Sequence, residues 1–89
     1  MPYITQADRE RFNFGLEAFW ETIQSKGISN GDLNYLYSML AKFYLMKHGK
    51  SYNTMSDVVK ALECAKLEFY RRAMAPYENT KLEQNGDVY

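Results

Sequence analysis

Cationic and aromatic side chains gather around residue 70 of this sequence, where Lys66, Tyr70, Arg71, Arg72 and Tyr77 lie close together. Arginine forms bidentate hydrogen bonds with phosphate groups, and aromatic rings stack on nucleobases. The cations would bind phosphate and the tyrosines would stack on a base, so this pattern predicts a site for a small nucleotide. The candidate ligand-binding residues are Arg71, Arg72, Lys66, Tyr70, Tyr77 and Tyr35.

A structural interpretation of the same cluster stays open. Basic residues are favoured at the carboxyl ends of helices, where they interact with the negative end of the helix dipole. In this interpretation Arg71 and Arg72 cap a helix and pair with Glu68, while Tyr70 and Tyr77 pack in the core.

Nothing else in the sequence assembles an active site. His48 is the only histidine and Cys64 the only cysteine, and neither has a partner nearby in the sequence for nucleophilic or metal chemistry. We expect His48 to interact with a helix end and Cys64 to be a buried, unreactive thiol.

The acidic residues do not form a magnesium site. Glu17 and Glu21 are one helical turn apart, whereas helical enzymes that hydrolyse nucleoside triphosphates place acid pairs three residues apart on facing helices. The glycines at positions 27 and 31 lack the lysine of a phosphate-binding loop. The sequence therefore predicts no enzyme activity, no metal and no cofactor.

The composition indicates one small domain that self-associates. The chain has 89 residues, and 16% of them are aromatic, more than one small core needs. Small chains gain stability by joining other chains, so we expect a homo-oligomer. The net charge of +0 argues against binding to nucleic-acid polymers or to anionic membranes.

The local patterns predict an all-α fold, a compact bundle of three to four helices within a single domain over 1–89. Hydroxyl residues followed three positions later by an acid mark helix starts at Thr5, Ser29 and Thr54. Gly27, Gly49 and Gly86 mark helix ends, and Pro76 marks an end or a bend. The predicted helices cover residues 6–25, 30–47, 54–75 and a short 77–84, followed by a tail over 86–89.

The second predicted helix is apolar on two sides. One apolar stripe contains Leu33, Leu36, Tyr37, Leu40 and Tyr44, and a second contains Tyr35, Met39, Phe43 and Met46. A helix with two apolar sides is expected to be buried on both. We therefore expect it to be the central helix, or to face both its own core and a neighbouring subunit.

The carboxyl-terminal part resembles a family of short, uncharacterised proteins of tailed bacteriophages. The resemblance rests on Ala61–Arg72, Ala75–Glu78 and Asn85–Val88, and on the similar segments Met1–Thr5 and Gly31–Tyr35. It implies an accessory protein made in the cytoplasm of the infected bacterial host. No functional residue is carried over from the family.

Two functional hypotheses follow, both without catalysis. In the first, the oligomer sequesters a small nucleotide immune signal and so counters host defence. In the second, the protein inhibits a host protein by docking the Tyr35–Met39–Phe43–Met46 stripe on it. The single cysteine and the lack of an apolar run of roughly 20 residues both fit a soluble, cytoplasmic protein.

Overall fold

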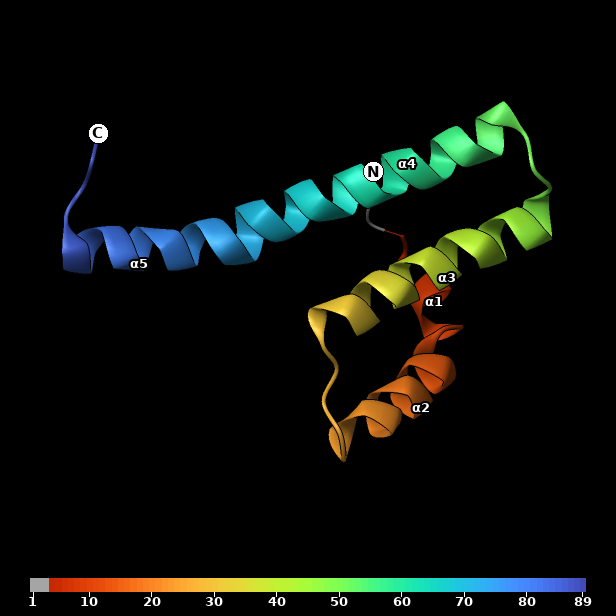
Figure 1. Cartoon of the computed structure of the whole chain (residues 1–89). Coiled ribbons are helices and arrows are strands. Elements are labelled where there is room, and N and C mark those ends of the chain that lie inside the picture. Colours follow the sequence, from red (N-terminus) through yellow and green to blue (C-terminus); the bar gives the residue numbers. More distant parts are fainter. Residues whose placement is uncertain (1–3) are drawn as a thin grey trace.

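The computed structural model describes residues 4–89, and 81% of these are helical, with no strand among them (Figure 1). The all-α prediction is confirmed. The elements are α1 (Gln6–Glu10), α2 (Asn13–Gln24), α3 (Asn30–His48), α4 (Tyr52–Phe69), the π-helical turn η1 (Tyr70–Met74) and α5 (Ala75–Asn85).

Side-chain caps start the helices close to the predicted positions. Thr5 Oγ1 accepts a hydrogen bond from the backbone N–H of Asp8 at 3.1 Å. Ser29 and Asp32 form a reciprocal capping box, with both hydrogen bonds at 3.0 Å. Each cap satisfies backbone donors that have no partner inside the helix.

The third cap differs from the prediction, because Ser51 rather than Thr54 is the N-cap of α4. Thr54 is the third residue of that helix, and its hydroxyl accepts from the backbone N–H of Ser51 at 2.9 Å. Asp57, predicted to belong to this cap, instead accepts a hydrogen bond from the hydroxyl of Tyr44.

Two glycines end helices in a backbone conformation that other residues rarely adopt. Gly49 follows α3 with φ 86° and Gly86 follows α5 with φ 92°, which confirms the predicted helix ends at these two positions. Gly27 was expected to end the first helix in the same way, but its φ is not positive and Ser25 is the C-cap.

The first predicted helix, 6–25, is divided into α1 and α2 by a turn at Arg11 and Phe12. No glycine or proline marks this break. Phe12 is the N-cap of α2 and provides no side-chain cap. The guanidinium of Arg11 lies 4.7 Å from the centre of the Phe12 ring, a cation–π contact at the turn.

α4, η1 and α5 follow one another without interruption and form one long rod over residues 52–85 (Figure 1). The predicted end or bend near Ala75 falls where η1 gives way to α5, whose first turn contains Pro76, although the helical backbone continues across this junction. Pro76 has no N–H to donate in the helix ladder and its ring crowds the preceding turn. The wider π turn bypasses this problem, because the N–H of Ala75 bonds to the carbonyl of Tyr70.

α3 packs against the first half of this rod (Figure 1). A groove of about 230 Å³ between the two helices is lined on α3 by Tyr37, Leu40, Ala41 and Tyr44, and on α4 by Asp57, Val58, Ala61, Leu62 and Ala65. The hydroxyl of Tyr44 donates to Asp57 across the two helices at 3.0 Å. This bond raises the pKa of Tyr44, and partial burial and the charge of Asp57 raise it further.

One chain does not enclose a core. Among residues 4–89 no side chain is buried, and the radius of gyration is 16.8 Å, whereas a compact 89-residue domain has a radius of about 12 Å. The predicted compact bundle is therefore absent from the single chain. The helices form, but much of the apolar surface that would make a bundle remains uncovered.

None of the helices within residues 4–89 is long and apolar enough to cross a membrane.

The capping box at the start of α3 provides the first testable prediction. Ser29→Ala removes a hydrogen-bond acceptor from the first turn, and such losses cost about 1 kcal/mol of stability. We expect a lower urea midpoint of unfolding, followed by circular dichroism at a fixed chain concentration. Ser38→Ala, in the middle of α3, is the matched control, because its hydroxyl only bonds to the carbonyl of Asn34. An equal loss in both variants would contradict the assigned cap.

Candidate functional site

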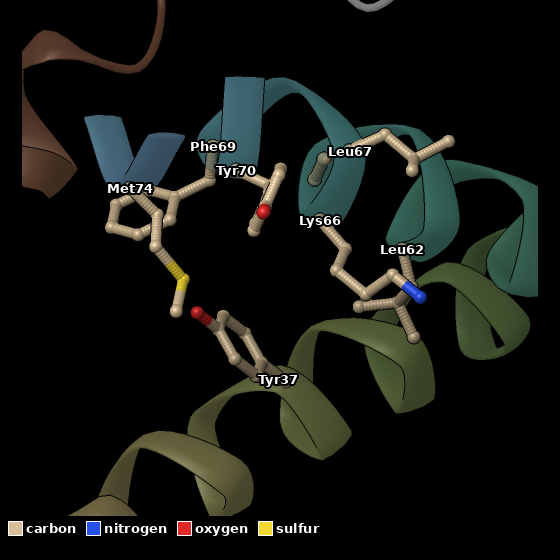
Figure 2. Close-up of a pocket in the computed structure, with 8 residues that line it drawn as sticks. Tyr37, Leu62, Lys66, Leu67, Phe69, Tyr70 and Met74 are labelled. Atoms are coloured by element: carbon tan, nitrogen blue, oxygen red, sulfur yellow. The ribbon is translucent and has the colours of Figure 1, made fainter. Parts of the chain in front are cut away.

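A groove of about 740 Å³ lies between α3 and the rod around the junction of α4 and η1, and we call it the corner groove. α3 contributes Tyr37, and the rod contributes the remaining lining residues. Figure 2 shows Tyr37 reaching from α3 toward Met74 on the opposite wall. The lining residues are Tyr37, Leu62, Ala65, Lys66, Leu67, Phe69, Tyr70 and Met74.

Most of this lining is apolar, and its polar groups come from Tyr37, Lys66 and Tyr70. The ammonium group of Lys66 lies 3.1 Å from a carboxylate oxygen of Glu63, in an ion pair exposed to solvent. The groove therefore combines two phenol rings with one cation whose present partner is only loosely held.

The hydroxyl of Tyr70 is engaged by a neighbour on α5. A hydrogen bond to the carboxylate of Glu78 raises the pKa of Tyr70, and the negative charge of Glu78 and partial burial raise it further. The neutral, donating form of this phenol is thus favoured. Tyr70 presents a ring to the groove while its hydroxyl holds the start of α5.

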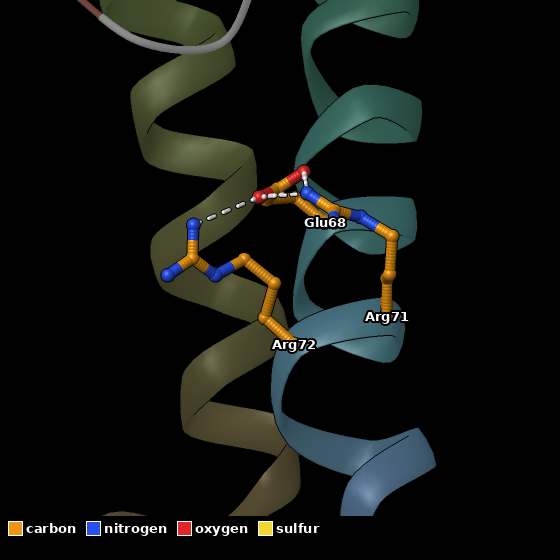
Figure 3. Close-up of polar contacts among 3 residues, drawn as sticks. All are labelled: Glu68, Arg71 and Arg72. Atoms are coloured by element: carbon orange, nitrogen blue, oxygen red, sulfur yellow. Dashed lines mark hydrogen bonds and ion pairs between the residues drawn. The ribbon is translucent and has the colours of Figure 1, made fainter.

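Arg71 and Arg72 share one carboxylate. Arg71 Nη2 lies 2.8 and 3.0 Å from the two oxygens of Glu68, and Arg72 Nη1 lies 3.6 Å from Glu68 Oε1. Figure 3 shows Glu68 between the two guanidinium groups. Pairing with Glu68 is what the structural interpretation of this cluster predicted for both arginines. Neither arginine lines the corner groove.

The last two candidate residues lie elsewhere. Tyr77 is on α5 and 62% exposed, with the ammonium of Lys81 5.6 Å from its ring centre. Tyr35 is on α3 and is also 62% exposed. Neither lines the corner groove. The structure thus brings together Lys66 and Tyr70 from the predicted set.

Tyr37 is the site residue that the sequence did not assign to ligand binding. Its place in the apolar stripe with Leu33, Leu40 and Tyr44 indicated only a core role. In the structure Tyr37 is 50% exposed and lines the groove opposite the α4–η1 junction. To identify it, one would have needed to know that Phe69, Tyr70 and Met74 lie across from this face of α3.

The single histidine and the single cysteine lie on different helices, and neither lines the corner groove. His48 lies in the last turn of α3, with its ring centre 4.5 Å from that of Tyr44. Cys64 is half-buried rather than buried, and it lies on a strip of α4 with Tyr52, Met55 and Val59. No group of three potential metal ligands occurs among the residues that the structure describes.

A comparison with protein families finds one match, to a family described as "Domain of unknown function (DUF6899)", over residues 1–88. No curated protein and no solved structure matches the chain. The family description names no source, so the bacteriophage context stays a prediction. Of the opening segment used for that resemblance, Met1, Pro2 and Tyr3 lie outside the described residues.

The hydrogen bond of Tyr70 predicts a specific response to alkaline pH. The pKa of Tyr70 is raised in the folded chain, so its contribution to stability is fully present below the unfolded pKa of about 10. That contribution is lost as the pH rises through the higher folded pKa. Tyr70→Phe should remove this part of the alkaline loss, measured as urea midpoints across the alkaline range.

Tyr52→Phe provides the control for this titration. It removes another exposed phenol of the same chain without touching Glu78. The control should keep the alkaline profile of the unmodified protein. A Tyr70→Phe profile that coincides with that of Tyr52→Phe would contradict the bond.

Proposed function

This chain belongs to the DUF6899 family, and we propose that it is a non-catalytic protein that sequesters a small nucleotide in the corner groove. The observation that supports this proposal is that Tyr37, Lys66 and Tyr70 all line one groove (Figure 2). Two aromatic rings would hold a base, and the ammonium group would hold a phosphate.

The groove has the dimensions and chemistry of a small-molecule site. Such sites measure roughly 300–1,000 Å³ and combine apolar walls with a few polar groups that orient the ligand. The corner groove, at about 740 Å³, falls within this range. Its walls of Leu62, Phe69 and Met74 would exclude water from one side of the base.

Lys66 is available to a phosphate at low cost. Its partner Glu63 is 55% exposed and Lys66 itself is 68% exposed, and exposed ion pairs of this kind contribute roughly 0–1 kcal/mol. The neighbouring cluster of Arg71, Arg72 and Glu68 combines two cations with one anion. That cluster adds one positive charge beside the groove, which favours an anionic ligand.

The resemblance to tailed-bacteriophage proteins supplies the proposed setting. The protein would act in the cytoplasm of the infected bacterial host as an accessory protein that counters a nucleotide-based defence signal. Its working form would be a homo-oligomer. Sequestration requires binding alone, so the ligand is released unchanged when the protein is denatured.

Isothermal titration against a panel of linear and cyclic nucleotides tests the proposal. Lys66→Met removes the cation but keeps most of the apolar stem, and loss of a charge-assisted hydrogen bond of about 1.5–3 kcal/mol corresponds to roughly 10- to 100-fold weaker binding. Lys60→Met, on the same helix but outside the corner groove, should bind as the unmodified chain does. No heat from any nucleotide, or equal affinity in both variants, would exclude the proposal.

A second candidate function is inhibition of a host protein through the α3 stripe, which consists of Tyr35, Met39, Phe43 and Met46. This candidate is supported by the exposure of Tyr35, Phe43 and Met46, at 62%, 53% and 71%. Exposed aromatic and methionine side chains are typical of adaptable interfaces.

Phe43→Asp tests this second candidate in a pull-down from bacterial lysate. The charged side chain should abolish capture of a host protein if the α3 stripe is its docking surface. The mass of the purified protein in solution is measured alongside. A host protein captured equally by Phe43→Asp and by the unmodified chain would contradict this candidate.

A further inference from the structure

The chain exposes far more surface than a folded monomer of its mass. Its accessible area is 8302 Å², whereas a compact protein of 10.5 kDa exposes about 5,400 Å². The difference is roughly 2,900 Å², and a stable interface needs only about 800 Å² from each partner. One chain thus carries enough excess surface for at least one extensive interface.

Part of this excess lies on two helices that are neighbours in the sequence. On α2, Leu16 and Trp20 lie one helical turn apart and are 62% and 61% exposed. On α3, the α3 stripe is exposed apart from half-buried Met39. Each helix therefore presents an apolar strip that no part of residues 4–89 buries.

The charges beside these two strips are complementary. α2 contains Glu17 and Glu21 and no Lys or Arg, whereas α3 contains Lys42 and Lys47 and no acid after Asp32. Within residues 4–89 none of these four side chains forms an ion pair. An α2 and an α3 from different chains could pair their apolar strips and their charges together.

We propose that a second copy of this chain covers the α3 stripe with its α2, and receives the first copy's α2 in return. Leu16 and Trp20 of each copy pack on Tyr35, Phe43 and Met46 of the other. Such an exchange is isologous and closes on itself as a two-fold dimer. The four helices contributed by two copies then form the bundle that a single chain lacks.

A second copy fits this surface better than an unrelated protein does. Each chain carries both halves of the complementary pair, and the net charge of +0 gives no long-range repulsion between copies. A chain with no buried side chain within residues 4–89 also needs its partner whenever it is folded. Obligate homodimers meet this requirement because folding and association occur together.

The dimer leaves the corner groove accessible. Tyr35 and Tyr37 are two residues apart on α3, so their side chains point in directions about 200° apart around the helix axis. The α3 stripe and the corner groove thus lie on opposite sides of α3. The inference therefore does not rest on nucleotide binding, and either proposal can fail without the other.

Trp20, the single tryptophan, reports directly on the proposed contact. We expect light scattering to give twice the chain mass at high concentration. On dilution, the emission of Trp20 should shift to the red and helix content should fall over the same concentration range. A chain mass that stays monomeric at every concentration would overturn the proposal, whether or not a host protein binds in its place.

Exchange of the charges identifies the partner surfaces. Variant one carries Glu17→Lys and Glu21→Lys, and variant two carries Lys42→Glu and Lys47→Glu. In either variant alone, like charges meet across the interface, so its dimer dissociation constant should rise at least tenfold. In an equal mixture each α2 meets an α3 of opposite charge, so a mixed dimer should form with the affinity of the unmodified chain.

The mixture also controls for failure to fold. If a variant measured by itself has less helix than the unmodified chain, its helix content should recover when the other variant is added, because folding and association are coupled. Lys60→Glu with Lys81→Glu, on the rod, is the matched control and should dimerise normally. The pairing of α2 with the α3 stripe would be contradicted by either of two results. One is that both charge variants dimerise as the unmodified chain does, and the other is that their mixture forms no mixed dimer.

Discussion

The hairpin of α3 and α4 positions everything else in this molecule. Its turn is fixed by Gly49, whose carbonyl accepts a hydrogen bond from the Thr54 hydroxyl at 2.8 Å. Further along, the hydrogen bond from Tyr44 to Asp57 joins the two helices. Because these contacts align the helices, Tyr37 faces the part of the rod that carries Lys66 and Tyr70. The proposed ligand site depends on this alignment.

The hairpin by itself cannot account for a stable protein. Two helices share one seam, and every large apolar side chain among residues 4–89 remains at least partly accessible to water. The hydrophobic contribution to stability scales with the apolar area removed from water. The single chain therefore gains little of that contribution from its own contacts, and many of the aromatic residues that are abundant in this sequence remain exposed in it.

Local signals were predictable from the sequence, and tertiary ones were not. The caps at Thr5 and Ser29 and the glycine ends at Gly49 and Gly86 depend on a few adjacent residues, and they occur where the sequence places them. Arg71 and Arg72 carried two interpretations because an arginine suits a phosphate and a carboxylate equally well. Only the position of Glu68 reveals their present partner. The start of α5 near Pro76 was predictable because proline suits the first turn of a helix, whereas the π turn that joins α5 to α4 has no local signal in the sequence.

The π turn at Tyr70–Met74 has a consequence for changes in the length of the chain. A π turn accommodates an additional residue within an otherwise α-helical segment. Deletion of one residue there would convert the π turn into an α turn, and α5 would keep nearly its present orientation about the rod axis, because the wider turn absorbs the additional residue. Deletion of one residue in a regular α-helical part of the rod would instead rotate everything beyond it by about 100°. The loss of one residue is thus tolerated better at this turn than elsewhere in the rod.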